Sequence, residues 1–387
     1  MGIMKVLFLV WESLGGRHMA KALKEKGFEV SFFGFSKEED AKRSKEQTLA
    51  ITNELMKGDY THVFSFNYFP TAAIACKACM VTYVAWVYDN PCIEMYSQTI
   101  SLPTNKVFVF DSMECLKFRE MGIDTVHYLP LASDPEYYQS VMCDSENTDR
   151  YSCDIAFVGA TKNEQNQRFS AFEKLDEYTR GYLNGIISAQ KSIYGLNFVE
   201  KTLSPMIMDR ISAVFPIKLG EDSLATPKWL ITNYYINQLI TGKERSEILS
   251  MLSEKYDVNL YTLEPTPELS KVRNMGEVDY YTEAPLVYSR ARINLNITLK
   301  SITAGIPLRA LDIMAAGGFL LTNYQQDFME HFASGEDFVY YENYEDLMEK
   351  CEYYLSHEKE RKEIAQNGLE KMKNFHTYGA RIEEMFG

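Results

Sequence analysis

The chain has 387 residues, 46% of them hydrophobic and 24% charged, which is typical of a globular protein large enough for two domains. Its formal net charge is −14, which argues against a nucleic-acid backbone or an anionic membrane as the main partner. No apolar run reaches the roughly 18 residues that a transmembrane helix needs. The apolar start lacks a small-residue cleavage site, so we expect a first strand rather than a signal peptide, and a cytoplasmic protein.

Strands and helices are expected to alternate through the N-terminal part of the chain. The expected strands are 5–10, 28–35, 60–66, 81–88, 106–110 and 125–129, and the expected helices are 16–26, 36–57, 70–79 and 112–121. Such alternation indicates a parallel, doubly wound sheet. Ligands of these sheets lie beyond the carboxyl ends of the strands, so the residues there are the first candidates for function.

Two of these strand ends carry candidate site residues. Gly15 and Gly16 form a strand-to-helix turn that lets a ligand approach the backbone at a helix N-terminus, although the pair could simply make a tight turn. Asp89 follows a very apolar strand, where a partly desolvated carboxylate could act as a general base. Its alternative role is to form an Asp-Asn-Pro turn. Glu12 and His18 are rival candidates for the base, and His18 could equally be structural.

A polar segment at 144–150 breaks this pattern and is predicted to link a first domain, 1–140, to a second, 151–375. The second domain is expected to begin with the strand 154–158, which is followed by Gly159 and Lys162. A mostly helical stretch at about 165–255 comes next. The remaining expected strands are 258–263, 293–298 and 337–341, and the remaining expected helices are 285–290, 344–355, 359–373 and 378–386.

The most informative segment runs from Ser301 to Thr322 and is expected to form a loop, a short helix and a buried strand. Pro307 suits the first turn of the helix, and Gly317 suits the left-handed residue that ends it. Arg309 and Asp312 are three residues apart and share a helix face. A helix N-terminus with a nearby arginine is suited to phosphate, and a carboxylate one turn later can bind sugar hydroxyls. The alternative is an ordinary surface helix with an ion pair.

The seven cysteines indicate neither a disulfide framework nor a metal site. Cys76 and Cys79 have the spacing of a metal or redox motif, but they lie in an apolar segment without a second cysteine pair or a nearby histidine. We therefore expect small buried thiols on a helix. No Asp-x-Asp motif is present that could clamp a metal–diphosphate complex.

Two Rossmann-like domains, a Gly-Gly turn after the first strand and the late phosphate-and-ribose helix together resemble the GT-B glycosyltransferases. Asp-Ile-Met-Ala-Ala-Gly (312–317) matches the second half of the late motif of family 4 glycosyltransferases, whereas Ala304 stands where that family has its first Glu. The late region is more similar to the spore maturation protein CgeB group. The segments that carry this similarity are Leu-Asn-Ile-Thr (295–298), Gly-Ile-Pro-Leu-Arg (305–309), 312–322, 353–361, His-Thr-Tyr (376–378) and, in the first domain, Trp-Val-Tyr-Asp-Asn-Pro (86–91).

This resemblance implies an α/β GT-B fold with two doubly wound domains facing across a cleft and a helical insertion in the second. It implies that 376–387 packs back on the first domain. It also implies that Asp312 holds the ribose and that Arg309, helped by Lys300 or Lys162, neutralises the diphosphate. Backbone N–H groups at the Gly15–Gly16 turn would face the same diphosphate. Gly159, Asn296 and Gly305 complete the expected donor site.

The activity that the resemblance implies is transfer of a hexosyl-type sugar from a nucleotide-diphosphate sugar to an acceptor hydroxyl, without a metal and with no cofactor besides the donor. A UDP-sugar is the expected donor, and the acceptor is a protein, a glycan or a lipid. The missing glutamate at Ala304 means that the donor sugar does not follow from family 4. A GT-B-fold UDP-sugar epimerase and an inactive nucleotide-sugar-binding protein are the alternatives.

Overall fold

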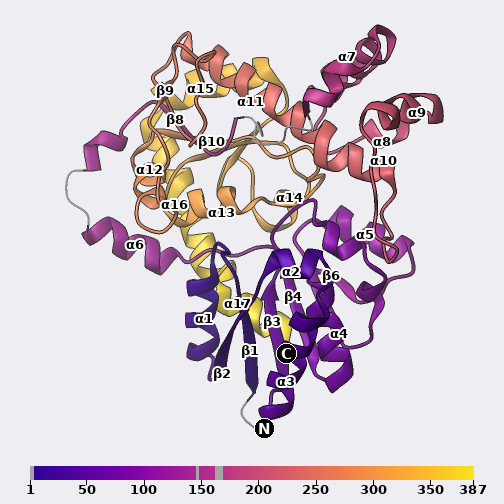
Figure 1. Ribbon diagram of the computed structural model, residues 1–387. Helices are drawn as coiled ribbons and strands as arrows, with labels where there is room; N and C mark the ends of the chain where they lie inside the picture. Colours follow the sequence, from indigo (N-terminus) through magenta and orange to yellow (C-terminus); the bar gives the residue numbers. More distant parts are fainter. Residues whose placement is uncertain (1–3, 145–147, 162–168) are drawn as a thin grey trace. The chain divides into compact units, whose positions relative to one another are not determined.

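The computed structural model describes residues 4–144, 148–161 and 169–387, which form two compact α/β units (Figure 1). Unit 1 comprises Met1–Ser133, Gly220–Ala225 and Phe375–Gly387, and unit 2 comprises Asp134–Leu219 and Thr226–Asn374. Each unit contains one six-stranded sheet. The C-terminal segment from Phe375 is thus grouped with unit 1, as is the short excursion Gly220–Ala225.

The sheet of unit 1 is parallel throughout and has the strand order β2-β1-β3-β4-β5-β6. Its strands are β1 (Lys5–Val10), β2 (Glu29–Gly34), β3 (His62–Phe66), β4 (Thr82–Val87), β5 (Asn105–Val109) and β6 (Val126–Tyr128), and its main helices are α1 (Gly16–Glu25), α4 (Pro70–Cys79), α5 (Ser112–Glu120) and α17 (Tyr378–Phe386). The chain leaves β1 in one direction for β2 and then crosses to β3 on the other side. The predicted doubly wound sheet is therefore confirmed, with its switch point between β1 and β3.

The single helix expected at 36–57 is two helices, α2 (Lys37–Ala41) and α3 (Lys45–Lys57). Ser36 caps the first and Ser44 caps the second, each by accepting a backbone N–H three residues later. Arg43, between them, has a φ of 54°, which a continuing helix does not allow. The cap residue Ser44 thus starts a second helix within a stretch whose composition alone predicts a single one.

The sheet of unit 2 is also parallel and has the order β12-β11-β10-β7-β8-β9. Its strands are β7 (Ile155–Val158), β8 (Val258–Tyr261), β9 (Arg273–Asn274), β10 (Ile293–Asn296), β11 (Leu320–Asn323) and β12 (Val339–Tyr341). The chain passes from β7 through β8 to β9 and then crosses to β10 on the other side of β7. The switch point of unit 2 therefore lies between β7 and β10. The two-residue β9 was not expected, because it is too short to carry a pattern.

Helices account for most of the rest of unit 2, including the segment between β7 and β8. They are α6 (Pro135–Asp144), α7 (Glu177–Lys191), α8 (Val199–Thr202), α9 (Pro205–Val214), α10 (Pro227–Leu230), α11 (Asn237–Ser253), α12 (Ala284–Arg290), α13 (Leu308–Ala315), α14 (Phe328–His331), α15 (Tyr344–Ser356) and α16 (Glu358–Phe375), with a π-helical turn at Ile231–Ile236. A separate apolar cluster, from Leu175 to Ile240, holds the inserted helices together. Of the segment 144–150 that was expected to be a linker, Asp144 ends α6, residues 148–150 belong to the 3-10 helix Thr148–Tyr151, and residues 145–147 lie outside the described residues.

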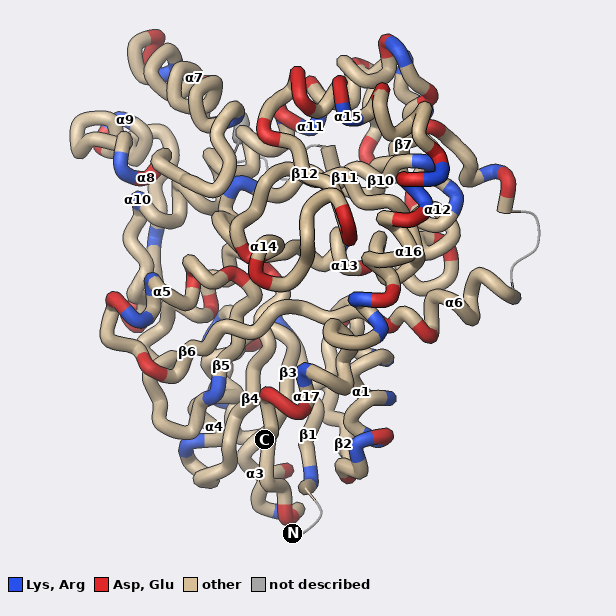
Figure 2. The backbone as a smooth tube through the Cα atoms, turned by 180° about the vertical axis from the view of Figure 1, so that it is seen from behind, with Lys and Arg blue, Asp and Glu red and all other residues tan. Residues whose placement is uncertain are grey.

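Acidic and basic residues are spread over both units (Figure 2). Within the described part of the chain, the structure has no helix that is both long and apolar enough to cross a membrane.

Candidate functional site

Two arginines meet at the switch point of unit 2. Arg245 comes from α11 and Arg309 from the first turn of α13. Their guanidinium carbons lie 5.4 Å and 4.9 Å from the ring centroid of Phe157 in β7. The crevice outside the strand ends at a switch point is where doubly wound sheets bind ligands, so both charges stand at the expected position of a ligand.

Arg309 is held in place by two neighbours. Its Nη1 donates a hydrogen bond to Oδ1 of Asn296 at 3.0 Å, and the Asn296 amide is fixed in turn by Thr298 and Thr322. Gly159, directly after β7, has a φ of 144° and leaves room for the guanidinium. The conformation of Gly159 and the course of Arg309 therefore depend on each other.

Arg245 ties the ends of β7 and β10 together. Its Nη1 donates to the carbonyl of Ala160 at 2.8 Å, while Nε and Nη2 donate to the carbonyl of Ile297 at 3.2 Å and 2.8 Å. Among the residues that the structure describes, neither Arg245 nor Arg309 has a carboxylate within 4.0 Å. Burial, together with the charge of Arg309, lowers the pKa of Arg245 to about 9. Two partly buried cations without a carboxylate in direct contact make this position a candidate site for an anion.

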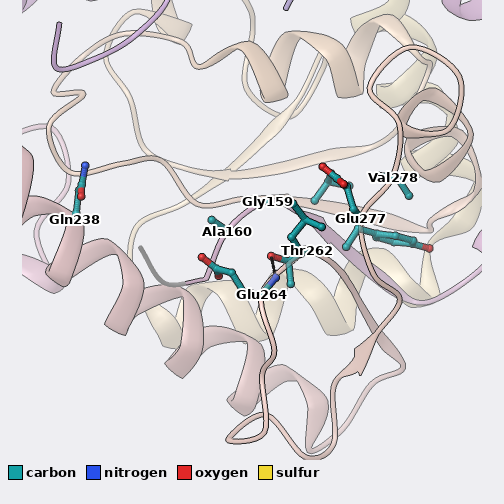
Figure 3. A pocket seen from close by; sticks show the side chains of 10 residues that line it. Gly159, Ala160, Gln238, Thr262, Glu264, Glu277 and Val278 are labelled. Atoms are coloured by element: carbon teal, nitrogen blue, oxygen red, sulfur yellow. Dashed lines mark hydrogen bonds between the residues drawn. The ribbon is translucent and has the colours of Figure 1, made fainter. Parts of the chain in front are cut away.

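A pocket of about 590 Å³ opens next to these arginines, at the carboxyl ends of β7 and β8 (Figure 3). Its lining is Val158, Gly159, Ala160, Gln238, Tyr261, Thr262, Leu263, Glu264, Glu277 and Val278. Gly159 and Ala160 belong to this lining and also contact Arg309 and Arg245, respectively. The volume suits a nucleoside, so a diphosphate at the arginines and a nucleoside in the pocket would be contiguous.

Lys300, which was expected to help bind phosphate, contacts other groups in this structure. Its ammonium is buried and lies 3.2 Å from Oε1 of Glu244, a carboxylate with no exposed surface. It also donates to the carbonyl of Lys191 at 3.1 Å and lies over the ring of Tyr194. An ammonium with these partners is structural, because moving it to a ligand would leave Glu244 charged and buried without a partner.

Other expected donor-site residues differ in their exposure. Asn296 is fully buried and acts on Arg309 rather than on solvent. Gly305 is buried, and its carbonyl accepts a hydrogen bond from Gln325. Asp312 lies in α13 and is 1% exposed. Pro307 is the N-cap of α13 rather than a residue of its first turn. Lys162 lies outside the described residues.

Asp89 follows β4 and is contacted by Asn67, which follows β3 at the switch point of unit 1. The Asn67 amide donates to Asp89 Oδ2 at 2.7 Å, and Asn67 Oδ1 accepts the Asp89 backbone N–H at 3.1 Å. The ammonium of Lys37 lies 3.9 Å from the same carboxylate oxygen and 4.2 Å from the ring centroid of Trp11, beyond β1. The Asp89 side chain is 57% exposed, so it is accessible rather than desolvated as its apolar strand suggested.

Tyr378 of α17 covers the glycine turn of unit 1. Gly15 is a left-handed N-cap with a φ of 79°, and a side chain there would collide with the Tyr378 hydroxyl. His18 is buried and stacks on the Tyr378 ring at 5.6 Å. In this structure both Gly15 and His18 thus pack against Tyr378 within unit 1. Gly16 begins α1, and Glu12 is exposed.

Sequence reasoning missed Arg245, because Lys-Glu-Arg (243–245) in a charged helix is typical of a solvated helix face. No sequence signal distinguishes this arginine from the charged residues of an exposed helix face. Among residues 4–144, 148–161 and 169–387, no three His, Cys, Asp or Glu side chains are grouped so that they could hold a metal ion.

Comparisons with known proteins bear on the fold and on the C-terminal part of the chain. Residues 243–387 match a family model described as glycosyl transferase-like. A search of curated proteins returned no match. Among solved structures, sucrose-phosphate synthase from Thermosynechococcus elongatus superposes with a TM-score of 0.59 at 8% identity over 99% of this chain and 98% of its own.

Two further structures have the same fold. Anabaena HepE, solved in complex with UDP and glucose, gives a TM-score of 0.56 at 11% identity over 99% of each chain. A putative UDP-N-acetylglucosamine 2-epimerase from Listeria monocytogenes gives 0.51 at 9% identity over 100% of this chain and 96% of its own. The chain therefore has the GT-B fold, and its residues 243–387 are similar in sequence to glycosyl transferases.

Proposed function

We propose that this protein is a glycosyltransferase that moves a sugar, of hexosyl type, from a nucleoside-diphosphate sugar to an acceptor hydroxyl. The observation that carries the proposal is the pair Arg245 and Arg309 at the switch point of unit 2, without a carboxylate partner among the described residues. A diphosphate supplies the negative charge that these two guanidinium groups lack, and planar guanidinium groups suit phosphate oxygens.

In the proposed transfer reaction, negative charge develops on the leaving diphosphate. The acceptor oxygen forms a bond to the anomeric carbon, and the bond from that carbon to the diphosphate oxygen breaks. The electron pair goes to the leaving diphosphate, whose growing charge Arg245 and Arg309 stabilise. In this proposal the positive charge comes from the protein, so the transfer needs no metal.

Asp89 in unit 1 is the proposed base that takes the acceptor proton. Its carboxylate is accessible, and Asn67 and Lys37 orient it. Asp312 keeps its proposed role toward the ribose hydroxyls. Because Asp312 is 1% exposed, a ribose reaches it only if the residues that cover it move when the donor binds.

Incubation with a panel of nucleoside-diphosphate sugars tests the proposal, with free nucleotide and glycosylated product measured with and without glycan, peptide and lipid acceptors. We expect nucleotide release that depends on an acceptor. Asp89→Asn should abolish transfer while nucleotide affinity stays within about twofold, because Asp89 and the arginines belong to different units. Absence of nucleotide binding to the wild-type protein would contradict the proposal.

Epimerisation is the second candidate, because the Listeria structure of the same fold is described as a putative 2-epimerase. An epimerase converts a single UDP-sugar without any acceptor. Product analysis with UDP-N-acetylglucosamine alone separates the two activities, because a new UDP-sugar epimer would favour epimerisation and contradict transfer. A protein that binds nucleotide but converts no donor under any condition would be a binding protein.

A further inference from the structure

The pocket beside the arginines has a charge pattern that bears on which base it accepts. Its two charged lining residues, Glu264 and Glu277, are both acidic. The cations Arg245 and Arg309 reach only its edge, at Ala160 and Gly159. A ligand that matches this arrangement has an anionic end at the arginines and an end rich in hydrogen-bond donors inside the pocket.

The two glutamates differ in how they are engaged. Oε2 of Glu264 accepts hydrogen bonds from the backbone N–H and the hydroxyl of Thr161, at 2.7 Å and 3.0 Å, so this carboxylate fixes the chain after β7. Glu277, in the loop after β9, is exposed, and no hydrogen bond or ion pair engages its carboxylate within the described part of the chain. In Figure 3 the two side chains lie on either side of Gly159 and Thr262. Both oxygens of Glu277 are thus available to a ligand.

A carboxylate with two available oxygens pairs best with two adjacent N–H donors. Guanine offers such a pair, N1–H and the N2 amino group, on one edge. Uracil has a single N–H between two carbonyl oxygens, and adenine and cytosine place a ring-nitrogen acceptor next to their amino group. On any of these three bases an acceptor would face one carboxylate oxygen, which is unfavourable.

We propose that the pocket is selective for guanine and that Glu277 reads its N1–H and N2 amino edge, so the donor is a guanosine-diphosphate sugar. This inference rests on the proposed function and narrows it, in place of the UDP-sugar expected from the resemblance. The parallel pair of charge-assisted hydrogen bonds gives the selectivity, and the arginines bind any nucleoside diphosphate.

Isothermal titration calorimetry with GDP, UDP and ADP tests the inference on the wild-type protein, Glu277→Gln and Glu277→Lys. The exposed helical residue Glu349 provides a matched control as Glu349→Gln. We expect the wild-type protein and the control to bind GDP at least fivefold more tightly than UDP. Glu277→Gln should lose most of that preference, because an amide presents only one acceptor. Glu277→Lys should favour UDP, because an ammonium donates to carbonyl oxygens.

The outcomes separate this inference from the proposed function. UDP binding as tight as GDP binding to the wild-type protein, or an unchanged preference in Glu277→Gln, would overturn guanine selectivity and leave the glycosyltransferase proposal standing. Failure of all three nucleotides to bind the wild-type protein would overturn both.

Discussion

The guanidinium of Arg309 fills the space that a side chain on Gly159 would need. An ideal Cβ on Gly159 would lie 2.6 Å from Arg309 Nη2, closer than Cβ atoms approach other atoms in folded proteins, and 3.3 Å from its Cζ. The glycine after β7 and the arginine of α13 therefore form one structural element at the switch point of unit 2. A substitution at Gly159 therefore tests whether nucleotide binding depends on the position of the Arg309 guanidinium.

Gly159→Ala should weaken nucleotide binding as well as stability. The new methyl group displaces Arg309, and the φ of 144° is strained for alanine, so we expect a loss of about 1–3 kcal/mol in the free energy of unfolding. Gly335→Ala is the matched control, because Gly335 also has a positive φ of 80° but has open space around its Cβ position. Urea denaturation and calorimetry should show lost stability in both variants and lost nucleotide affinity in Gly159→Ala alone.

Lys300→Met should destabilise the protein without a direct effect on nucleotide binding. Burial lowers the pKa of Lys300 and raises the pKa of Glu244, so each charge depends on the other. Removal of the ammonium alone leaves Glu244 buried and unpaired, at a cost of about 3–5 kcal/mol. The double variant Lys300→Met/Glu244→Gln should recover much of that loss in urea denaturation. A large loss of nucleotide affinity in the folded double variant would instead support a role of Lys300 in binding phosphate.

Asp40 should make stability depend on pH in an unusual direction. It is 1% exposed, and burial raises its pKa to about 6, although hydrogen bonds from Thr71 oppose this rise. The folded state therefore binds the proton more tightly than the unfolded state, whose aspartate titrates near about 4. The stability contributed by this proton is full below about pH 4 and is lost as the pH rises toward about 6.

Asp40→Asn removes this dependence while it keeps an acceptor for Thr71. Compared with the variant, the wild-type protein should lose up to about 3 kcal/mol of unfolding free energy between pH 4 and pH 7. Urea denaturation across this range measures the difference, and the exposed Asp59→Asn serves as the control. Parallel pH profiles for the wild-type protein and Asp40→Asn would show that the Asp40 carboxyl is not perturbed.

Much of the fold could be predicted, because buried parallel strands are short apolar runs between turn residues. The strand KVLFLV, predicted at 5–10, matches β1, and the glycine-ended helix before β11 was placed within a residue or two. Elements without a pattern were missed, such as the two-residue β9 and the break around Arg43, where local caps override composition. The doubly wound topology follows from the alternation of strands and helices alone. The short strand β9 and the helix break at Arg43 depend on single residues.

Of the two arginines of the candidate site, only Arg309 was predicted from the sequence, because it lies in the motif-like segment 301–322. Arg309 stands on the helix that the sequence singled out, and the structure places it at the switch point. The ion pair of Lys300 with Glu244 was not foreseen, because sequence spacing does not show that a lysine lies against a buried carboxylate on α11. Arg245 was missed for the complementary reason, because only the fold brings α11 to the ends of β7 and β10.

The central claim is that Arg245 and Arg309 together bind the diphosphate of a nucleotide. Calorimetric titration of the wild-type protein, Arg245→Gln and Arg309→Gln with GDP and UDP tests it most directly, with the exposed Arg290→Gln as the control. We expect each site variant to lose at least about tenfold in affinity for both nucleotides, the worth of one charge-assisted contact, while the control stays within about twofold. Unchanged affinity in folded Arg245→Gln and Arg309→Gln would contradict the claim.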